Sequence, residues 1–83
     1  MNNYPKIPCV PKSHAASVKL REIYVDAYKI LETITENPMC IMYSKKDINR
    51  AHGIYNRVNG IETPNNTEDY ISGWLEADEL ISK

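Results

Sequence analysis

Apolar residues recur at intervals of four, three, four, three and four residues along the segment 14–36. They are Ala16, Leu20, Ile23, Ala27, Ile30 and Ile34. This spacing places them on one face of an α-helix, the face that a helix buries against its neighbours. Ser13 is suited to cap the amino end of this helix. Asn37-Pro38 ends it, because the residue before a proline is pushed out of the helical region.

Two shorter patterns of the same kind predict two further helices. The first begins after Ser44, ends at Asn59-Gly60, and has apolar positions at Ile48, Ala51, Tyr55 and Val58. The second begins after Thr67, a suitable capping residue, and its broad apolar face contains Tyr70, Ile71, Trp74, Leu75, Ala77 and Ile81. Three helices without a strand indicate an all-α fold, a small three-helix bundle with one long and two shorter helices.

The segments outside the predicted helices carry their own signals. Residues 1–12 contain Pro5, Pro8 and Pro11, and this spacing of three favours an extended Pro-rich amino-terminal arm. The apolar run 39–43 is predicted to be a buried connector, because no other segment offers it a strand to pair with. We therefore expect the arm at 1–12 and a single helical domain at 13–83.

The composition agrees with one small folded domain. The chain has 83 residues, of which 42% are hydrophobic and 25% charged, as is ordinary for a globular protein. No apolar stretch approaches the ~20 residues needed to cross a membrane, and the amino terminus lacks the apolar run of a signal peptide. We therefore expect a cytoplasmic protein without a membrane partner. In that compartment Cys9 and Cys40 should be free thiols, with a disulfide between them as the alternative.

Metal-ligating and catalytic groups are few and poorly spaced. Cys9, His14, Cys40 and His52 lack the close ligand pairs that are typical of a structural zinc site. The residue one helical turn after His52 is Asn56, which cannot serve as the orienting carboxylate of a catalytic base. The three glycines are scattered, so no phosphate-binding loop is formed. We expect no catalytic residue, no metal and no cofactor.

Charge is unevenly distributed, although the net charge is only −1. Residues 1–60 carry +4 and residues 61–83 carry −5. Opposite its apolar face, the second helix has a polar face that contains Lys45, Lys46, Asn49, Arg50, His52, Asn56 and Arg57. Basic residues interleaved with asparagine suit phosphates and base edges, or an acidic protein surface. Gly53 lies among them, where the missing side chain would let a partner approach closely.

The acidic third helix bears on how this basic face is used. Glu76, Asp78 and Glu79 crowd its carboxyl end, where the helix dipole favours cations, so a cation from elsewhere should compensate them. The basic second helix, a second copy of the protein or a basic site on a partner would each supply it. The polar face of the second helix is then interpreted either as solvated, as paired with this acidic helix, or as a binding surface. A helix-turn-helix is excluded, because its recognition helix would be this acidic helix and would present carboxylates to DNA.

The segment from Tyr70 to Ala77 has the pattern Tyr-x-x-Gly-Trp-x-x-Ala. It resembles the closing helices common in short phage and mobile-element open reading frames, and this resemblance implies an accessory protein that acts by binding a host component. We therefore expect a small non-enzymatic interaction protein that binds another protein and inhibits or modulates it. The alternatives are a nucleic-acid-binding protein that uses the second helix, and a self-associating structural protein such as a homodimer.

Overall fold

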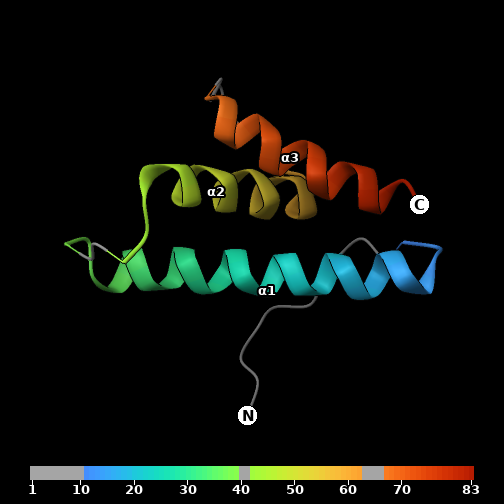
Figure 1. Ribbon diagram of the computed structural model, residues 1–83, viewed down its shortest axis with the longest axis horizontal. Helices are drawn as coiled ribbons and strands as arrows, with labels where there is room; N and C mark the ends of the chain where they lie inside the picture. Colours follow the sequence, from blue (N-terminus) through green and yellow to red (C-terminus); the bar gives the residue numbers. More distant parts are fainter. Residues whose placement is uncertain (1–10, 40–41, 63–66) are drawn as a thin grey trace, which may run out of the picture.

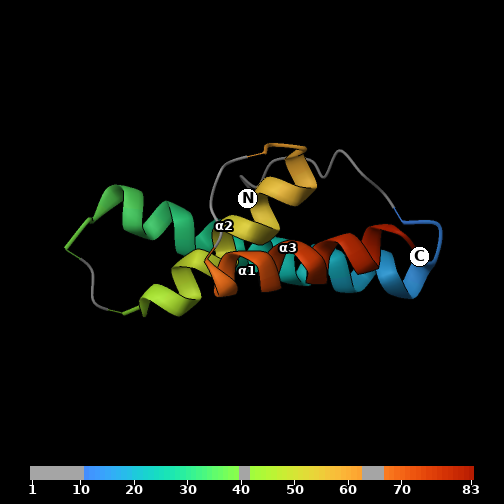
Figure 2. The same cartoon turned by 90° about the horizontal axis from the view of Figure 1, so that it is seen from above.

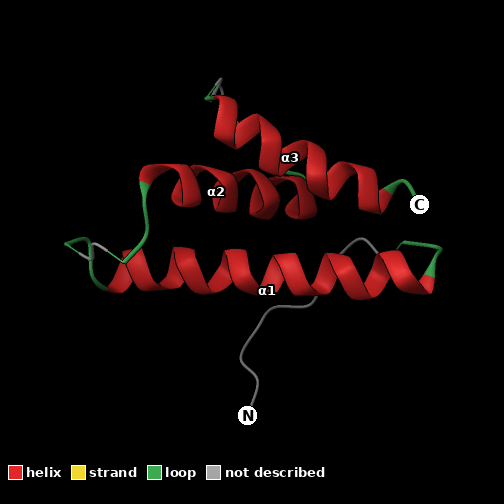
Figure 3. Ribbon diagram, in the orientation of Figure 1, coloured by secondary structure: helices red, strands yellow, loops and turns green. Residues whose placement is uncertain are grey.

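The structure, a computed structural model, describes residues 11–39, 42–62 and 67–83. Its helices are α1 (His14–Glu36), α2 (Lys45–Asn59) and α3 (Glu68–Ile81). Figure 1 shows their arrangement, and Figure 3 shows helix and loop but no strand in the described part of the chain. The predicted all-α fold with one long and two shorter helices is confirmed. Most of the Pro-rich arm (residues 1–10) and both cysteines lie outside the described residues.

The helix ends follow from local sequence. The Ser44 hydroxyl accepts a hydrogen bond from the backbone N–H of Asp47 at 3.2 Å, and Ser13 accepts a longer one of 3.4 Å from Ala16. Gly60 caps the carboxyl end of α2, and its φ of 68° is the left-handed conformation that glycine adopts without steric cost. The prediction for Thr67 is only half right, because it stands at the cap position of α3 but its side chain makes no capping hydrogen bond.

Helices α2 and α3 pack closely against each other, and both lie on the same side of α1 (Figure 1). Seen from above, α3 runs over the amino-terminal half of α1, whereas α2 crosses the middle of α1 (Figure 2). The backbone N–H of Ser13 donates to the carbonyl oxygen of Lys83 at 3.2 Å, which ties the start of α1 to the end of α3. Helix α2 is therefore covered by α1 on one side and by α3 on another.

The hydrophobic core draws on all three helices. Its buried members are Leu20, Ile23, Tyr24 and Ala27 of α1, Ala51, Ile54 and Val58 of α2, and Ala77 of α3. Ile54 is fully buried although it lies outside the predicted apolar face of α2, whereas the predicted Ile48 and Tyr55 are only half-buried. The reason is that α3 covers a second side of α2, so the buried face extends past the positions that α1 alone would cover.

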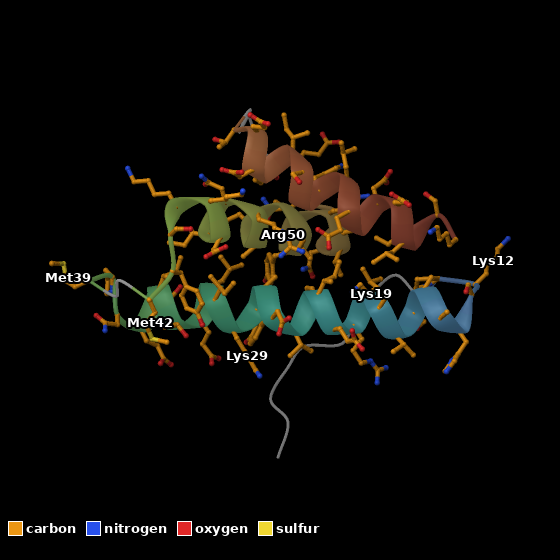
Figure 4. All side chains as sticks on the ribbon, in the orientation of Figure 1. Lys12, Lys19, Lys29, Met39, Met42 and Arg50 are labelled. Atoms are coloured by element: carbon orange, nitrogen blue, oxygen red, sulfur yellow. The ribbon has the colours of Figure 1, made fainter. Side chains whose placement is uncertain are left out.

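Two predictions about buried apolar residues are wrong. Met39 and Met42, which lie in the connection between α1 and α2, are 84% and 76% exposed, whereas Tyr43 of the same connector is half-buried. Figure 4 shows both side chains at the end of the bundle, away from the core. On α3, Ile71 and Leu75 are 43% and 56% exposed. The buried face of α3 is narrower than predicted, because its buried residues Tyr70, Gly73 and Ala77 lie on one side of the helix and positions 71 and 75 fall on the other.

Candidate functional site

The seven candidate binding residues of α2 do not form one surface. They are Lys45, Lys46, Asn49, Arg50, His52, Asn56 and Arg57, and they divide into residues that contact α3 and residues that face solvent. Positions 50, 53 and 57 share the side of the helix that α3 covers, since residues three and four apart lie above one another on an α-helix. The interpretation that the basic face is paired with the protein's own acidic helix therefore holds for part of the set.

The two arginines of α2 bind carboxylates of α3. Arg50 holds Glu76 in a bidentate pair, with Nε 3.1 Å from Oε2 and Nη2 2.7 Å from Oε1. Arg57 donates from Nε to Oδ1 of Asp78 at 2.8 Å, and its guanidinium carbon lies 6.0 Å from the centroid of the Trp74 ring. These pairs supply the cations that the carboxyl-terminal half of α3 was predicted to need.

Asn56 is also a structural residue. It is 8% exposed, and its side-chain amide donates to the hydroxyl of Tyr70 at 3.0 Å. A buried amide with its partner inside the protein is not available to orient an external ligand. Asn56 therefore helps to hold α2 against α3.

Gly53 requires a correction. The sequence predicts that its missing side chain leaves an opening for a partner, but α3 occupies this space. A β-carbon at position 53 would lie 2.8 Å from the backbone nitrogen of Trp74 and would collide with the carbonyl oxygen of Tyr70. The glycine is therefore needed for the close approach of two helices of the same chain.

Four of the candidates remain on the surface, and we refer to them as the outer face of α2: Lys45, Lys46, Asn49 and His52. Both lysines are exposed and make no ion pair with any residue in the described ranges. Asn49 and His52 are half-buried. Residues 45, 49 and 52 are spaced by four and three, so they form one stripe along the helix.

A groove of about 420 Å³ adjoins this stripe, between the carboxyl-terminal half of α1 and α2. We call it the α1–α2 groove, and its lining residues are Tyr28, Leu31, Glu32, Thr35 and Glu36 of α1 with His52, Tyr55 and Asn56 of α2. His52 thus belongs both to the outer face of α2 and to the groove. Sequence reasoning missed the groove, although the position of Tyr28 and Leu31 beside the apolar stripe of α1 was a usable signal.

Tyr55, which lines this groove, packs against a buried tyrosine of the core. Its ring stacks on that of Tyr24, with the centroids 6.0 Å apart and the planes inclined by 16°. Tyr24 is 1% exposed, and burial raises the pKa of its hydroxyl above the ordinary value of 10.0, although the hydrogen bond that Asn59 donates to it at 3.2 Å acts in the opposite direction. The aromatic wall of the groove therefore rests on a fixed, uncharged ring.

The described residues contain neither a cluster of metal-ligating side chains nor a helix that could span a membrane. Among them, no group of three or more His, Cys, Asp or Glu side chains is placed to hold a metal ion, and Cys9 and Cys40 lie outside them. Within the same residues, no helix is both long enough and apolar enough to span a bilayer.

The fold and this surface define a small all-α protein whose described residues form three helices, with a polar helix face beside a shallow aromatic groove. Comparison of the chain with known protein families, with characterised proteins and with solved structures finds no match. The Tyr-x-x-Gly-Trp-x-x-Ala pattern has a packing role here, since Tyr70, Gly73 and Ala77 are all buried.

Proposed function

We propose that the protein has no catalytic activity and acts by binding another protein through the outer face of α2. The observation that carries this proposal is the division of the basic residues of α2. Arg50 and Arg57 are neutralised by Glu76 and Asp78 of α3, and Lys45 and Lys46 are left without a partner in the described residues. These two lysines lie with Asn49 and His52 in the first two turns of α2, and their mixed polarity suits an acidic patch on a protein.

The outer face of α2 suits a nucleic acid less well than it suits a protein. The affinity for a nucleic acid rests on several phosphate contacts, each made by a cation that displaces a counterion. The outer face of α2 offers two lysines, while α3 next to it carries Glu68 and Asp69, neither of which makes an ion pair with a described residue. The acidic helix would repel a polyanion laid across α2. The resemblance of the Tyr70–Ala77 segment to closing helices of short phage and mobile-element reading frames supports a host protein as the partner, which the binding would inhibit or modulate.

The test compares two double charge reversals. Lys45→Glu with Lys46→Glu changes the outer face of α2, and Lys12→Glu with Lys19→Glu makes the same charge change at exposed lysines near the amino end of α1. Tagged proteins are used to capture partners from lysate with and without nuclease treatment, and the affinity for the purified captured protein is then measured. We expect the first variant to lose binding by about tenfold or more and the control to lose much less.

Three results would overturn the proposal. The first is equal loss in both variants, which would indicate a general effect of net charge. The second is disappearance of the captured material after nuclease treatment, which would indicate a nucleic-acid partner. The third is concentration-dependent self-association of the purified protein that the Lys45 and Lys46 reversal abolishes, which would indicate a second copy as the occupant.

A further inference from the structure

We propose that the α1–α2 groove binds an arginine side chain of the partner protein. This inference deepens the proposed function and rests on it, because it takes the ligand of the groove to be part of the protein that the adjoining outer face of α2 binds. His52 connects the two surfaces, since it lies on the stripe with Lys45 and Asn49 and also lines the groove. A partner segment that crosses α2 at His52 would reach the groove directly.

The groove is formed by side chains whose positions are already fixed. Tyr55 stacks on the buried ring of Tyr24. Asn56 at the same wall is held by its hydrogen bond to Tyr70. On the opposite wall, Leu31 packs against the core of the bundle. A ligand would therefore meet a preformed surface and would not have to order the protein first, which reduces the free-energy cost of binding.

The charge of the groove selects a cation. Glu32 and Glu36 lie one helical turn apart on α1, both are exposed, and neither makes an ion pair with a described residue. The charged or titratable groups that line the opposite wall are His52 and Tyr55. Lys29 precedes Glu32 by three residues but does not line the groove, and Figure 4 shows it on the side of α1 away from α2.

The combination of aromatic walls with two carboxylates fits arginine in particular. The three methylene groups of its side chain can lie along Leu31 while the charged end stays near water. Its planar guanidinium can stack on a tyrosine ring and can donate several hydrogen bonds to carboxylates in a fixed fork. The volume of about 420 Å³ lies near the small end of the range for ligand pockets, as a single long side chain requires.

The experiment is a titration of the full chain with Nα-acetyl-arginine methylamide, followed by NMR. The matched probe is Nα-acetyl-citrulline methylamide, which has nearly the same shape but no charge. We expect the arginine probe to shift the resonances of Tyr28, His52 and Tyr55 in a saturable manner. The affinity of the citrulline probe should be lower by at least about tenfold. Equal binding of the two probes, or shifts spread evenly over the surface, would overturn the proposal.

Variants of the carboxylates locate the site. Glu32→Gln with Glu36→Gln should weaken binding of the arginine probe by about tenfold or more. Glu22→Gln with Asp26→Asn removes the same charge from an exposed stretch of α1 that does not line the groove, and it should leave binding unchanged. Thermal unfolding by circular dichroism checks that both variants are folded. Equal loss of binding in the two variants would overturn the assignment of the groove.

The inference and the proposed function fail in different ways. Lys45→Glu with Lys46→Glu should weaken binding of the partner by about tenfold or more and leave binding of the arginine probe intact, because neither lysine lines the groove. Capture that depends on these lysines in a protein that does not bind the probe would overturn the groove inference alone. Binding of the probe in a protein whose capture of a partner is unaffected by the lysine variant would overturn the proposed function.

Discussion

Gly53 of α2 and Gly73 of α3 form a reciprocal contact, in which each glycine lies against the backbone of the other helix. A β-carbon at Gly53 would collide with the carbonyl oxygen of Tyr70, and one at Gly73 would collide with the carbonyl oxygen of Arg50. The two helices can therefore approach more closely than side chains at these positions would permit. This close approach brings the arginines of α2 within reach of the carboxylates of α3.

The first prediction concerns substitution of these glycines. Gly53→Ala and Gly73→Ala should each lower the free energy of unfolding by about 3 kcal/mol or more, because the new β-carbon meets rigid backbone and the helices must separate. In an open helix the same change would raise stability by up to about 1 kcal/mol, so the sign of the effect is decisive. Urea unfolding followed by circular dichroism measures it.

Gly60→Ala serves as the control for these two variants. Gly60 has a φ of 68° and nothing within 4 Å of a built β-carbon, so alanine there should cost only the strain of the left-handed conformation, about 1–2 kcal/mol. A stability of Gly53→Ala equal to or above that of the unaltered protein would contradict the close packing of α2 on α3.

The second prediction concerns the bidentate pair between Arg50 and Glu76. Both side chains are more than a third exposed, at 39% and 35%, so solvent screens the pair. A double-mutant cycle with Arg50→Gln and Glu76→Gln should give a coupling free energy of about 0.5–1 kcal/mol that decreases at high salt. The more exposed pair of Lys83 with Glu79, 3.5 Å apart, should give no measurable coupling in the same cycle. A salt-independent coupling for Arg50 and Glu76 would contradict an electrostatic origin.

The third prediction concerns the buried hydrogen bond between Asn56 and Tyr70. Tyr70→Phe removes the acceptor of the Asn56 amide, which is 8% exposed and cannot readily turn to water. The expected loss in the free energy of unfolding is about 1–3 kcal/mol. Tyr55→Phe is the matched control, because Tyr55 is half-buried and its hydroxyl makes no hydrogen bond within the described residues. Equal losses in the free energy of unfolding from the two substitutions would show that the hydrogen bond between Asn56 and Tyr70 does not stabilise the protein.

The helices could be predicted from the sequence because their signals are local. Ser13, Ser44 and Gly60 act within one turn of their own positions, and the apolar spacing of α1 defines its buried face without reference to the rest of the chain. The rotation of α2 could not be predicted in the same way. The apolar spacing of α2 does not include Ile54, because a single apolar face allows for one neighbouring helix, and α2 has two.

The candidate site also depends on how the helices pack, which the local sequence does not determine. The excess of acidic residues on α3 indicated that it would need cations, but which residues of α2 supply them depends on the crossing of the two helices. Gly53 lies at that crossing, against the backbone of α3, but a glycine in the sequence does not by itself distinguish contact with the same chain from contact with a partner. The α1–α2 groove likewise depends on how two helices diverge, which no periodicity encodes.

The last prediction follows from the raised pKa of Tyr24. Burial is the main cause of the shift, the neighbouring Tyr55 and Tyr28 add to it, and the hydrogen bond from Asn59 opposes it. In the unfolded chain the hydroxyl ionises near pH 10, whereas in the folded protein it stays protonated to higher pH. Above pH 10 the unfolded state therefore binds fewer protons than the folded state, and the free energy of unfolding must fall as the pH rises, by at most about 1.4 kcal/mol per pH unit for this one group.

The comparison of the protein with Tyr24→Phe isolates this contribution, because lysines and other tyrosines titrate in the same range in both proteins. Urea unfolding at a series of pH values from 9 to 11.5 should show a steeper alkaline loss for the unaltered protein, and the difference should begin near the unfolded pKa of about 10. Asn59→Ala should raise the pKa of Tyr24 further, since it removes the hydrogen bond that lowers it. Identical alkaline slopes in the unaltered protein and in Tyr24→Phe would mean that Tyr24 is not buried in solution. In that case the wall of the α1–α2 groove that Tyr55 forms would have lost its support.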